Sequence, residues 1–140
     1  MTVTLATLFT ALVSILAILV VFWTGLRVGG MRTKHNVVAP AVSGHPEFER
    51  AYRVQMNTME QFVIFLPLLW LAAIFFQMLP LLAGALGLVW IVGRIVYAQA
   101  YMADPSKRGL GFGISALATL GLLILALVGL VHDWMVLNAA

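Results

Sequence analysis

The fold is decided by an uncharged stretch, residues 61–93, with the sequence QFVIFLPLLWLAAIFFQMLPLLAGALGLVWIVG. As one helix its 33 residues would extend about 50 Å, whereas the hydrocarbon core of a bilayer is about 30 Å thick. A turn must therefore lie within it. We place this turn at Gln77-Met78-Leu79-Pro80, because proline removes a helix donor and disfavours helical geometry in the residue before it. The stretch thus predicts two membrane-spanning helices joined by a short turn.

Two further uncharged stretches lie outside this one, at residues 1–26 and between Arg108 and Asp133. Together they predict four spans, over about 4–27, 54–77, 81–103 and 109–131. We therefore expect an all-α integral membrane protein, a four-transmembrane-helix bundle in one domain over residues 1–140. The composition agrees, because only 9% of the residues are charged, against roughly 25% in soluble domains.

Size and composition also limit the possible functions. A lone bundle of 140 residues has little room for an enclosed site, so we expect it to associate with copies of itself. The chain has no cysteine, which excludes disulfides, thiolate metal clusters and cysteine nucleophiles. Any thiol chemistry must therefore use the sulfur of a substrate.

The basic residues indicate an orientation. Five lie between spans one and two and two between spans three and four, whereas the other turn and both ends have none. Basic loops stay in the cytoplasm, so we expect both basic loops there and both termini on the opposite side. The only sizeable linker, about 28–50, contains Gly29-Gly30, Pro40 and Pro46 and is predicted to be an ordered loop or a partly extended segment.

Arg94 lies inside the third span, about 14 Å from its cytoplasmic end at 1.5 Å per residue. An arginine near the centre of a membrane helix costs about 2.5–3.5 kcal/mol, so it should face protein or a polar cavity and have a partner. Glu60, at comparable depth on the second span, is the expected partner. Two interpretations follow: a structural ion pair between the spans, or part of a polar ligand pocket that opens to the cytoplasm.

Two stripes of polar residues favour the pocket. Each stripe follows helical spacing and so lies on one face of its helix. The stripes are Arg53, Asn57 and Glu60 on the second span, and Arg94, Tyr97 and Tyr101 on the third. Such a set can hold a small zwitterionic peptide, because guanidinium groups bind carboxylates bidentately and a glutamate accepts from an ammonium group. For the two tyrosines, an interfacial aromatic belt is the alternative.

Arg108 begins the fourth span, just beyond the stripe on the third. One interpretation is an ordinary anchor on the cytoplasmic side. The other is chemical: a thiol has a pKa of about 8.5, and a nearby arginine can lower that value and supply the nucleophilic thiolate. An arginine at a pocket rim therefore suits a substrate's thiol. Glu49 and Arg50 are expected at the solvated mouth of the pocket.

The run PEFERAYRVQMN at 46–57, with Glu60 one turn on, resembles the signature of the MAPEG family of membrane glutathione transferases. Arg94, Tyr97 and Tyr101, followed by Arg108, stand where that family has an Arg-x-x-Tyr-x-x-x-Tyr pattern and a thiolate-stabilising arginine. The resemblance spans nearly the whole chain.

The resemblance implies a homotrimer with three glutathione sites between neighbouring protomers, facing the cytoplasm. Glutathione would attack a lipophilic electrophile arriving from the bilayer, or reduce a lipid hydroperoxide. The matched positions imply Arg108 as the thiolate-stabilising residue and Arg32, Arg53, Gln55, Asn57, Glu60, Arg94, Tyr97 and Tyr101 as glutathione ligands.

Two positions depart from the pattern of family members that synthesise leukotrienes. Those members have a second arginine where this chain has Thr33 and a tyrosine where it has Gln61. We therefore expect a general detoxifying transferase or peroxidase. The short chain without a basic C-terminal tail suggests a bacterial member, in the inner membrane.

Other function classes find less support. His35, His45 and His132 have no spacing typical of a metal site, so no metal is predicted, and the basic residues are too dispersed for a nucleic-acid surface. A small multidrug exporter would carry a glutamate in its first span, whereas residues 1–26 have none. The alternative that stays open is a non-catalytic lipid-binding or scaffolding member of the same fold. The glycines of 109–113 are expected to permit close helix packing.

Overall fold

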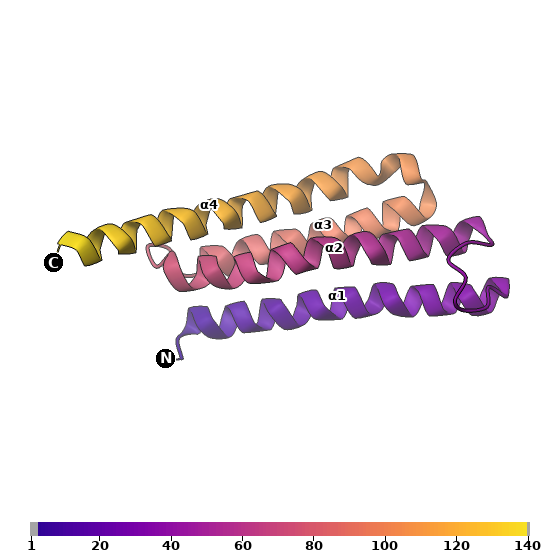
Figure 1. The fold of residues 1–140 in the computed structure, drawn as a ribbon, viewed down its shortest axis with the longest axis horizontal. Helices are drawn as coiled ribbons and strands as arrows, with labels where there is room; N and C mark the ends of the chain where they lie inside the picture. The colour runs from indigo at the N-terminus through magenta and orange to yellow at the C-terminus, as the bar shows by residue number, and fades with distance from the viewer. Residues whose placement is uncertain (1–2, 140) are drawn as a thin grey trace.

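The computed structural model describes residues 3–139, which form four long helices. The elements are α1 (Leu5–His35), α2 (Pro46–Phe75), α3 (Leu82–Ala103), the 3-10 turn η1 (Pro105–Arg108) and α4 (Gly109–Ala139). Each α-helix is long and apolar enough to cross a membrane, and no strand occurs within residues 3–139. The helices lie side by side with alternating direction, and both chain ends lie at the same end of the bundle (Figure 1). The predicted four-helix membrane bundle is confirmed.

The turn predicted inside the long uncharged stretch is confirmed. α2 ends at Phe75 and α3 begins at Leu82, so Pro80 lies between them. The side-chain amide of Gln77 donates to the backbone oxygens of Ala73 and Ile74, at 2.6 and 3.0 Å. These bonds satisfy carbonyl groups that the end of α2 leaves without helical partners.

The prediction of a loop over 28–50 is wrong, because only residues 36–45 lie outside the two helices. α1 continues to His35 and ends at Asn36, which has a left-handed backbone (φ 53°) and donates its N–H to the Arg32 oxygen. α2 starts with Pro46 in its first turn, after a cap in which Nδ1 of His45 accepts from the Glu47 N–H at 3.3 Å. These capping groups stabilise helical turns outside the apolar region, where hydropathy alone predicts none.

The two helix ends that flank this loop are tied together. The rings of His35 and His45 stack, with centroids 3.5 Å apart. Glu47 lies 2.7 Å from Nζ of Lys34 and 2.9 Å from Nε2 of His35. Two of the three histidines are therefore packed between the end of α1 and the start of α2.

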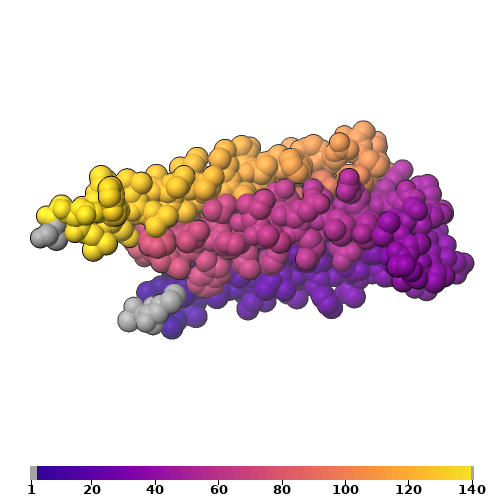
Figure 2. All heavy atoms as spheres, in the orientation of Figure 1, coloured from indigo at the N-terminus to yellow at the C-terminus, as the bar shows by residue number. Residues whose placement is uncertain are grey.

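The core lies among the helices, and large apolar side chains also cover the outside. α1 and α4 each pack against α2 and α3. At the centre, the fully buried rings of Phe65 and Trp90 stack at 4.0 Å. Leu117 on the outside is 70% exposed, and many other leucines and valines are also exposed. Such an apolar exterior suits a surface covered by lipid. The molecule is rod-shaped, and the last turns of α4 extend past the α2–α3 turn (Figure 2).

Two glycines bring α3 and α4 into close contact near the basic end of the bundle. A Cβ on Gly93 would lie 2.7 Å from the backbone nitrogen of Ser115, and a Cβ on Gly111 would overlap the backbone of Tyr97. Gly109 and Gly113, by contrast, have nothing within 4 Å of an added Cβ. The close packing expected of 109–113 is therefore confirmed at Gly111 alone.

We expect Gly111→Ala to lower the free energy of unfolding by about 1–3 kcal/mol, because the added methyl group must push α4 away from Tyr97. Gly113→Ala is the matched control. It adds the same group two residues later into open space, and it should leave stability unchanged or raise it by up to about 1 kcal/mol, the helix-propensity gain. Thermal unfolding in detergent micelles compares the two. Equal unfolding midpoints would contradict the close contact.

Candidate functional site

A recess of about 390 Å³ lies near the basic end of the bundle, lined by α2, α3 and the start of α4. Six of the nine residues predicted for the site line it, and Phe112 joins them. The six are Arg53, Asn57 and Glu60 from α2, Tyr97 and Tyr101 from α3, and Arg108 from η1. The structure therefore brings the whole stripe of α2, the two tyrosines of the stripe on α3 and Arg108 to one recess.

The lining offers complementary groups for a small charged molecule. Two guanidinium groups and one carboxylate give the recess a formal charge of +1. The rings of Tyr97 and Tyr101 lie 5.6 Å apart, and that of Phe112 lies 6.4 Å from Tyr97. A hydrogen bond of 3.4 Å from the Asn57 amide to Glu60 links two of the polar groups. Arginine forks and a carboxylate in one recess can bind a ligand with both acidic and ammonium groups.

Arg94 lies behind this wall and not on it. Its side chain is fully buried, and its Nη2 donates to Oδ1 of Asn57 at 3.0 Å and to Oγ1 of Thr58 at 2.8 Å. The guanidinium also lies over the Tyr97 ring, 4.1 Å from its centre. Arg94 thus contacts two residues that line the recess, Asn57 and Tyr97, and the buried Thr58 behind them.

The predicted ion pair between Arg94 and Glu60 is wrong, since no such pair forms within residues 3–139. Asn57 stands between the two charges: it accepts from Arg94 and donates to Glu60. The reason is direction, because Thr58 points from α2 into the bundle, whereas Glu60 is exposed toward the recess. Arg94 and Glu60 are therefore linked only indirectly, through hydrogen bonds to the Asn57 amide.

The buried guanidinium is not fully satisfied. Nε and Nη1 of Arg94 have no hydrogen-bond partner among the described residues. A buried cation without a carboxylate is costly, and more so at membrane depth. Stability therefore does not explain why this position carries an arginine.

Arg108 is placed at the recess by the short turn η1. Oδ1 of Asp104 accepts from the backbone and the hydroxyl of Ser106, at 2.9 and 2.8 Å, and these bonds hold the pKa of Asp104 below its ordinary value. Arg108 itself donates to the Pro105 oxygen at 3.3 Å and is otherwise exposed. The charge of Arg108 is therefore accessible to a molecule in the recess.

A second recess, of about 420 Å³, shares Arg53 and Tyr101 with the first. Glu49 and Arg50 line this second recess and not the first, so their place at the mouth of the first stays a prediction. Arg50 has a further role that the sequence did not suggest. Its Nη1 lies 3.3 Å from the oxygens of residues 102 and 103 and so caps the C-terminal end of α3.

Two predicted ligands, Arg32 and Gln55, do not reach the recess within one chain. Nη1 of Arg32 donates to the Ala41 oxygen at 2.7 Å, and its guanidinium lies 4.6 Å from the centre of the Phe48 ring. The Gln55 amide packs toward α1, 3.2 Å from where a Cβ of Gly25 would lie. Both residues therefore lie on the side that α1 and α2 share.

Thr58 is the supporting residue that sequence reasoning missed. It is fully buried and accepts the shorter of the two Arg94 bonds. The available signal was a hydroxyl group beside the predicted stripe on an otherwise apolar helix.

Fold and site together define a small multi-span membrane protein with a polar, basic recess at one end of its bundle. The family model described as the MAPEG family matches residues 10–128, so the chain belongs to the MAPEG family. The predicted membership is confirmed.

Three relatives illustrate this membership. An uncharacterised protein of Synechocystis sp. is 42% identical over 123 residues, which cover 88% of each chain. Human microsomal glutathione S-transferase 2 is 44% identical over 114 residues, 79% of this chain and 76% of the human one. Leukotriene C4 synthase of Bos taurus is 38% identical over 125 residues, 89% of this chain and 82% of the bovine one. The chain is thus an integral membrane protein of a family that includes glutathione-using enzymes.

Proposed function

We propose that this protein is a membrane glutathione transferase that activates the glutathione thiolate for attack on lipophilic electrophiles or lipid hydroperoxides. The observation that carries the proposal is the recess itself, in which Arg108 borders the same space as the polar stripe of α2 and the two tyrosines of α3. The similarity to microsomal glutathione S-transferase 2 supports the choice of glutathione as the thiol.

The groups of the recess suit the charges of glutathione, which has two carboxylates, an ammonium group and a thiol. Arg53 binds a carboxylate through its planar fork, and Glu60 accepts from the ammonium group. Asn57, Tyr97 and Tyr101 supply further hydrogen bonds. Arg94 acts through Asn57, whose amide it orients, and so is a positioning residue.

Arg108 stabilises the thiolate after the thiol has lost its proton to solvent. In conjugation, the sulfur forms a bond to an electrophilic carbon while the leaving group departs with its electron pair. With a hydroperoxide, the sulfur attacks an oxygen and the O–O bond breaks. A second glutathione then forms the disulfide, so that the products are an alcohol, water and oxidised glutathione.

The working unit that we propose is a homotrimer with a site at each boundary between protomers. Support comes from Arg32 and Gln55, which lie on the α1 and α2 side of the chain, whereas the recess opens beside α4. A neighbouring copy could present the first side to the second. From the basic loops we further propose a recess facing the cytoplasm and termini on the opposite side. The similarity to a Synechocystis protein supports our proposal of a bacterial inner membrane.

The test is stopped-flow absorbance near the thiolate band on the purified protein, followed by assays of glutathione with a panel of electrophiles and hydroperoxides. We expect a glutathione-dependent thiolate signal and turnover of at least one lipophilic substrate. S-methylglutathione, which has no thiol, is the control and should give no signal. Absence of both thiolate and product would contradict the proposal and favour a non-catalytic lipid-binding or scaffolding member of the fold.

A further inference from the structure

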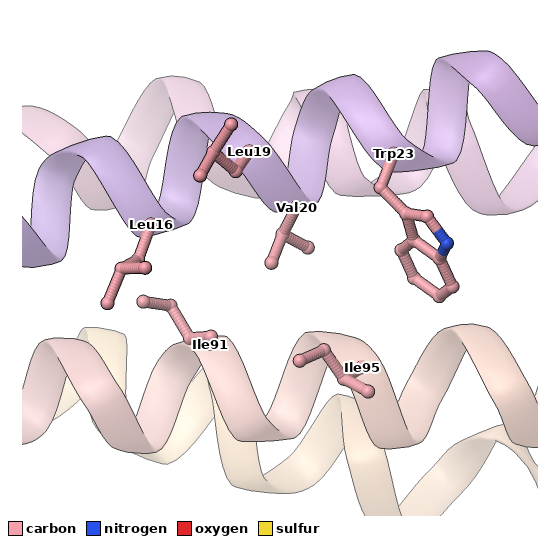
Figure 3. Close-up of a pocket in the computed structure, with 6 residues that line it drawn as sticks. All are labelled: Leu16, Leu19, Val20, Trp23, Ile91 and Ile95. Carbon is pink, nitrogen blue, oxygen red and sulfur yellow. The ribbon is translucent and has the colours of Figure 1, made fainter.

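A further hollow of the molecule lies between α1 and α3 and involves no residue of either recess. It is a groove of about 330 Å³ whose lining is entirely apolar: Leu16, Leu19, Val20 and Trp23 from α1, and Ile91 and Ile95 from α3. Leu16, Val20 and Trp23 point from α1 toward α3, and Ile91 points from α3 toward α1 (Figure 3). Leu19 remains 54% exposed, so the groove is open at the surface.

The groove ends beside a cation. Arg27, the first charged residue of the chain, follows Trp23 by one helical turn, and its guanidinium lies 5.2 Å from the centre of the Trp23 ring. Across residues 3–139 it has no ion pair. Tryptophan and arginine at the end of a long apolar stretch mark the boundary between hydrocarbon and headgroups. From Trp23 the groove extends to Leu16, about 10 Å deeper along the helix.

We propose that this groove binds an anionic phospholipid of the leaflet at the basic end, with an acyl chain along Leu16, Leu19 and Ile95 and the phosphate on Arg27. The wall gives an acyl chain only apolar contacts, and Arg27 supplies the complementary charge at headgroup level. The site is separate from the proposed glutathione activity, because no residue of α2 or α4 lines it.

A second copy of the chain is the competing occupant. The contact between copies that we propose uses the α1 and α2 side of one chain and the recess beside α4 of the next. The groove shares α1 with the first surface, but it opens toward α3, and no residue of α2 or α4 lines it. The lipid is therefore the occupant that the position of the groove favours.

Native mass spectrometry of the detergent-purified full chain tests the headgroup. Phosphatidylglycerol should bind more tightly than phosphatidylcholine. Arg27→Gln should lower the affinity for phosphatidylglycerol about fivefold, which corresponds to about 1 kcal/mol for one basic residue near an anionic headgroup. Lys107→Gln removes an exposed positive charge from the same end of the bundle, away from the groove, and should change the affinity less than twofold. Equal affinity for the two lipids, or no loss in Arg27→Gln, would overturn the proposal.

A pair of tryptophan variants tests the groove. Leu19 and Ile18 are adjacent and similarly exposed, at 54% and 50%, but only Leu19 lines the groove. Leu19→Trp should displace the lipid and Ile18→Trp should retain it; equal retention would overturn the proposal.

Cysteine crosslinking tests whether a second copy of the chain occupies the groove instead. Because the chain has no cysteine, Leu19→Cys introduces a single thiol at the groove. Crosslinking between copies well above that of Ile18→Cys would show that a second copy covers the groove, which also overturns the proposal.

Discussion

Replacing Arg108 by alanine is expected to lower kcat/KM for glutathione conjugation by about two to three orders of magnitude. This is the usual effect of removing one group that stabilises a developing anion. Arg108 borders the recess, and its hydrogen bond to the Pro105 oxygen leaves most of the guanidinium available to a ligand. Binding should suffer less than turnover, because Arg53 and Glu60 remain in place.

The pH dependence distinguishes this role from a structural one. A free thiol has a pKa of about 8.5, and a nearby arginine stabilises the charged form, so the thiolate signal of the wild-type protein should reach half its maximum below that pH. In Arg108→Ala the midpoint should move up, toward the value of free glutathione. Lys107→Ala, which removes the adjacent charge, should keep the wild-type midpoint. An unchanged thiolate signal in Arg108→Ala would refute the assignment.

The fold could be predicted from the sequence because the thickness of the bilayer limits the length of a single membrane-spanning helix. The 33 residues of 61–93 had to contain a turn, and Pro80 indicated where. The ends of α1 and α2 could not be predicted in this way. Outside the bilayer a helix extends as far as its caps allow, and the caps at Asn36 and His45 depend on local hydrogen bonds that hydropathy does not report.

For the site, helical spacing correctly predicted which polar residues share a face on each helix. It did not predict how the faces meet. Depth alone allowed Asn57, Thr58 or Glu60 to be the partner of Arg94, and the choice depends on how α2 and α3 are rotated and how closely they pack. That arrangement is set by contacts such as the Phe65 and Trp90 stack, which depend on all the helices at once.

Replacing Arg94 by methionine is expected to separate binding from stability. Methionine fills a similar space without the charge, and such replacements of buried ionic groups are often neutral or stabilising. The loss of hydrogen bonds to Asn57 and Thr58 offsets part of this gain, so the free energy of unfolding should stay within about 2 kcal/mol of wild type. Glutathione affinity, measured by calorimetry, should nevertheless fall by about ten- to a hundredfold, because the Asn57 amide loses the group that orients it.

A double-mutant cycle shows whether Arg94 acts through Asn57. Once Asn57→Ala has removed the amide, Arg94→Met should weaken glutathione binding only slightly further, because residues that share one hydrogen-bond network are not additive. Thr58→Val is the control: it takes away one acceptor of Arg94 but leaves the bond to Asn57, and its affinity should stay within about threefold of wild type. Fully additive losses would mean that Arg94 contacts the ligand by itself. Wild-type affinity in Arg94→Met would mean that the buried guanidinium has no part in binding.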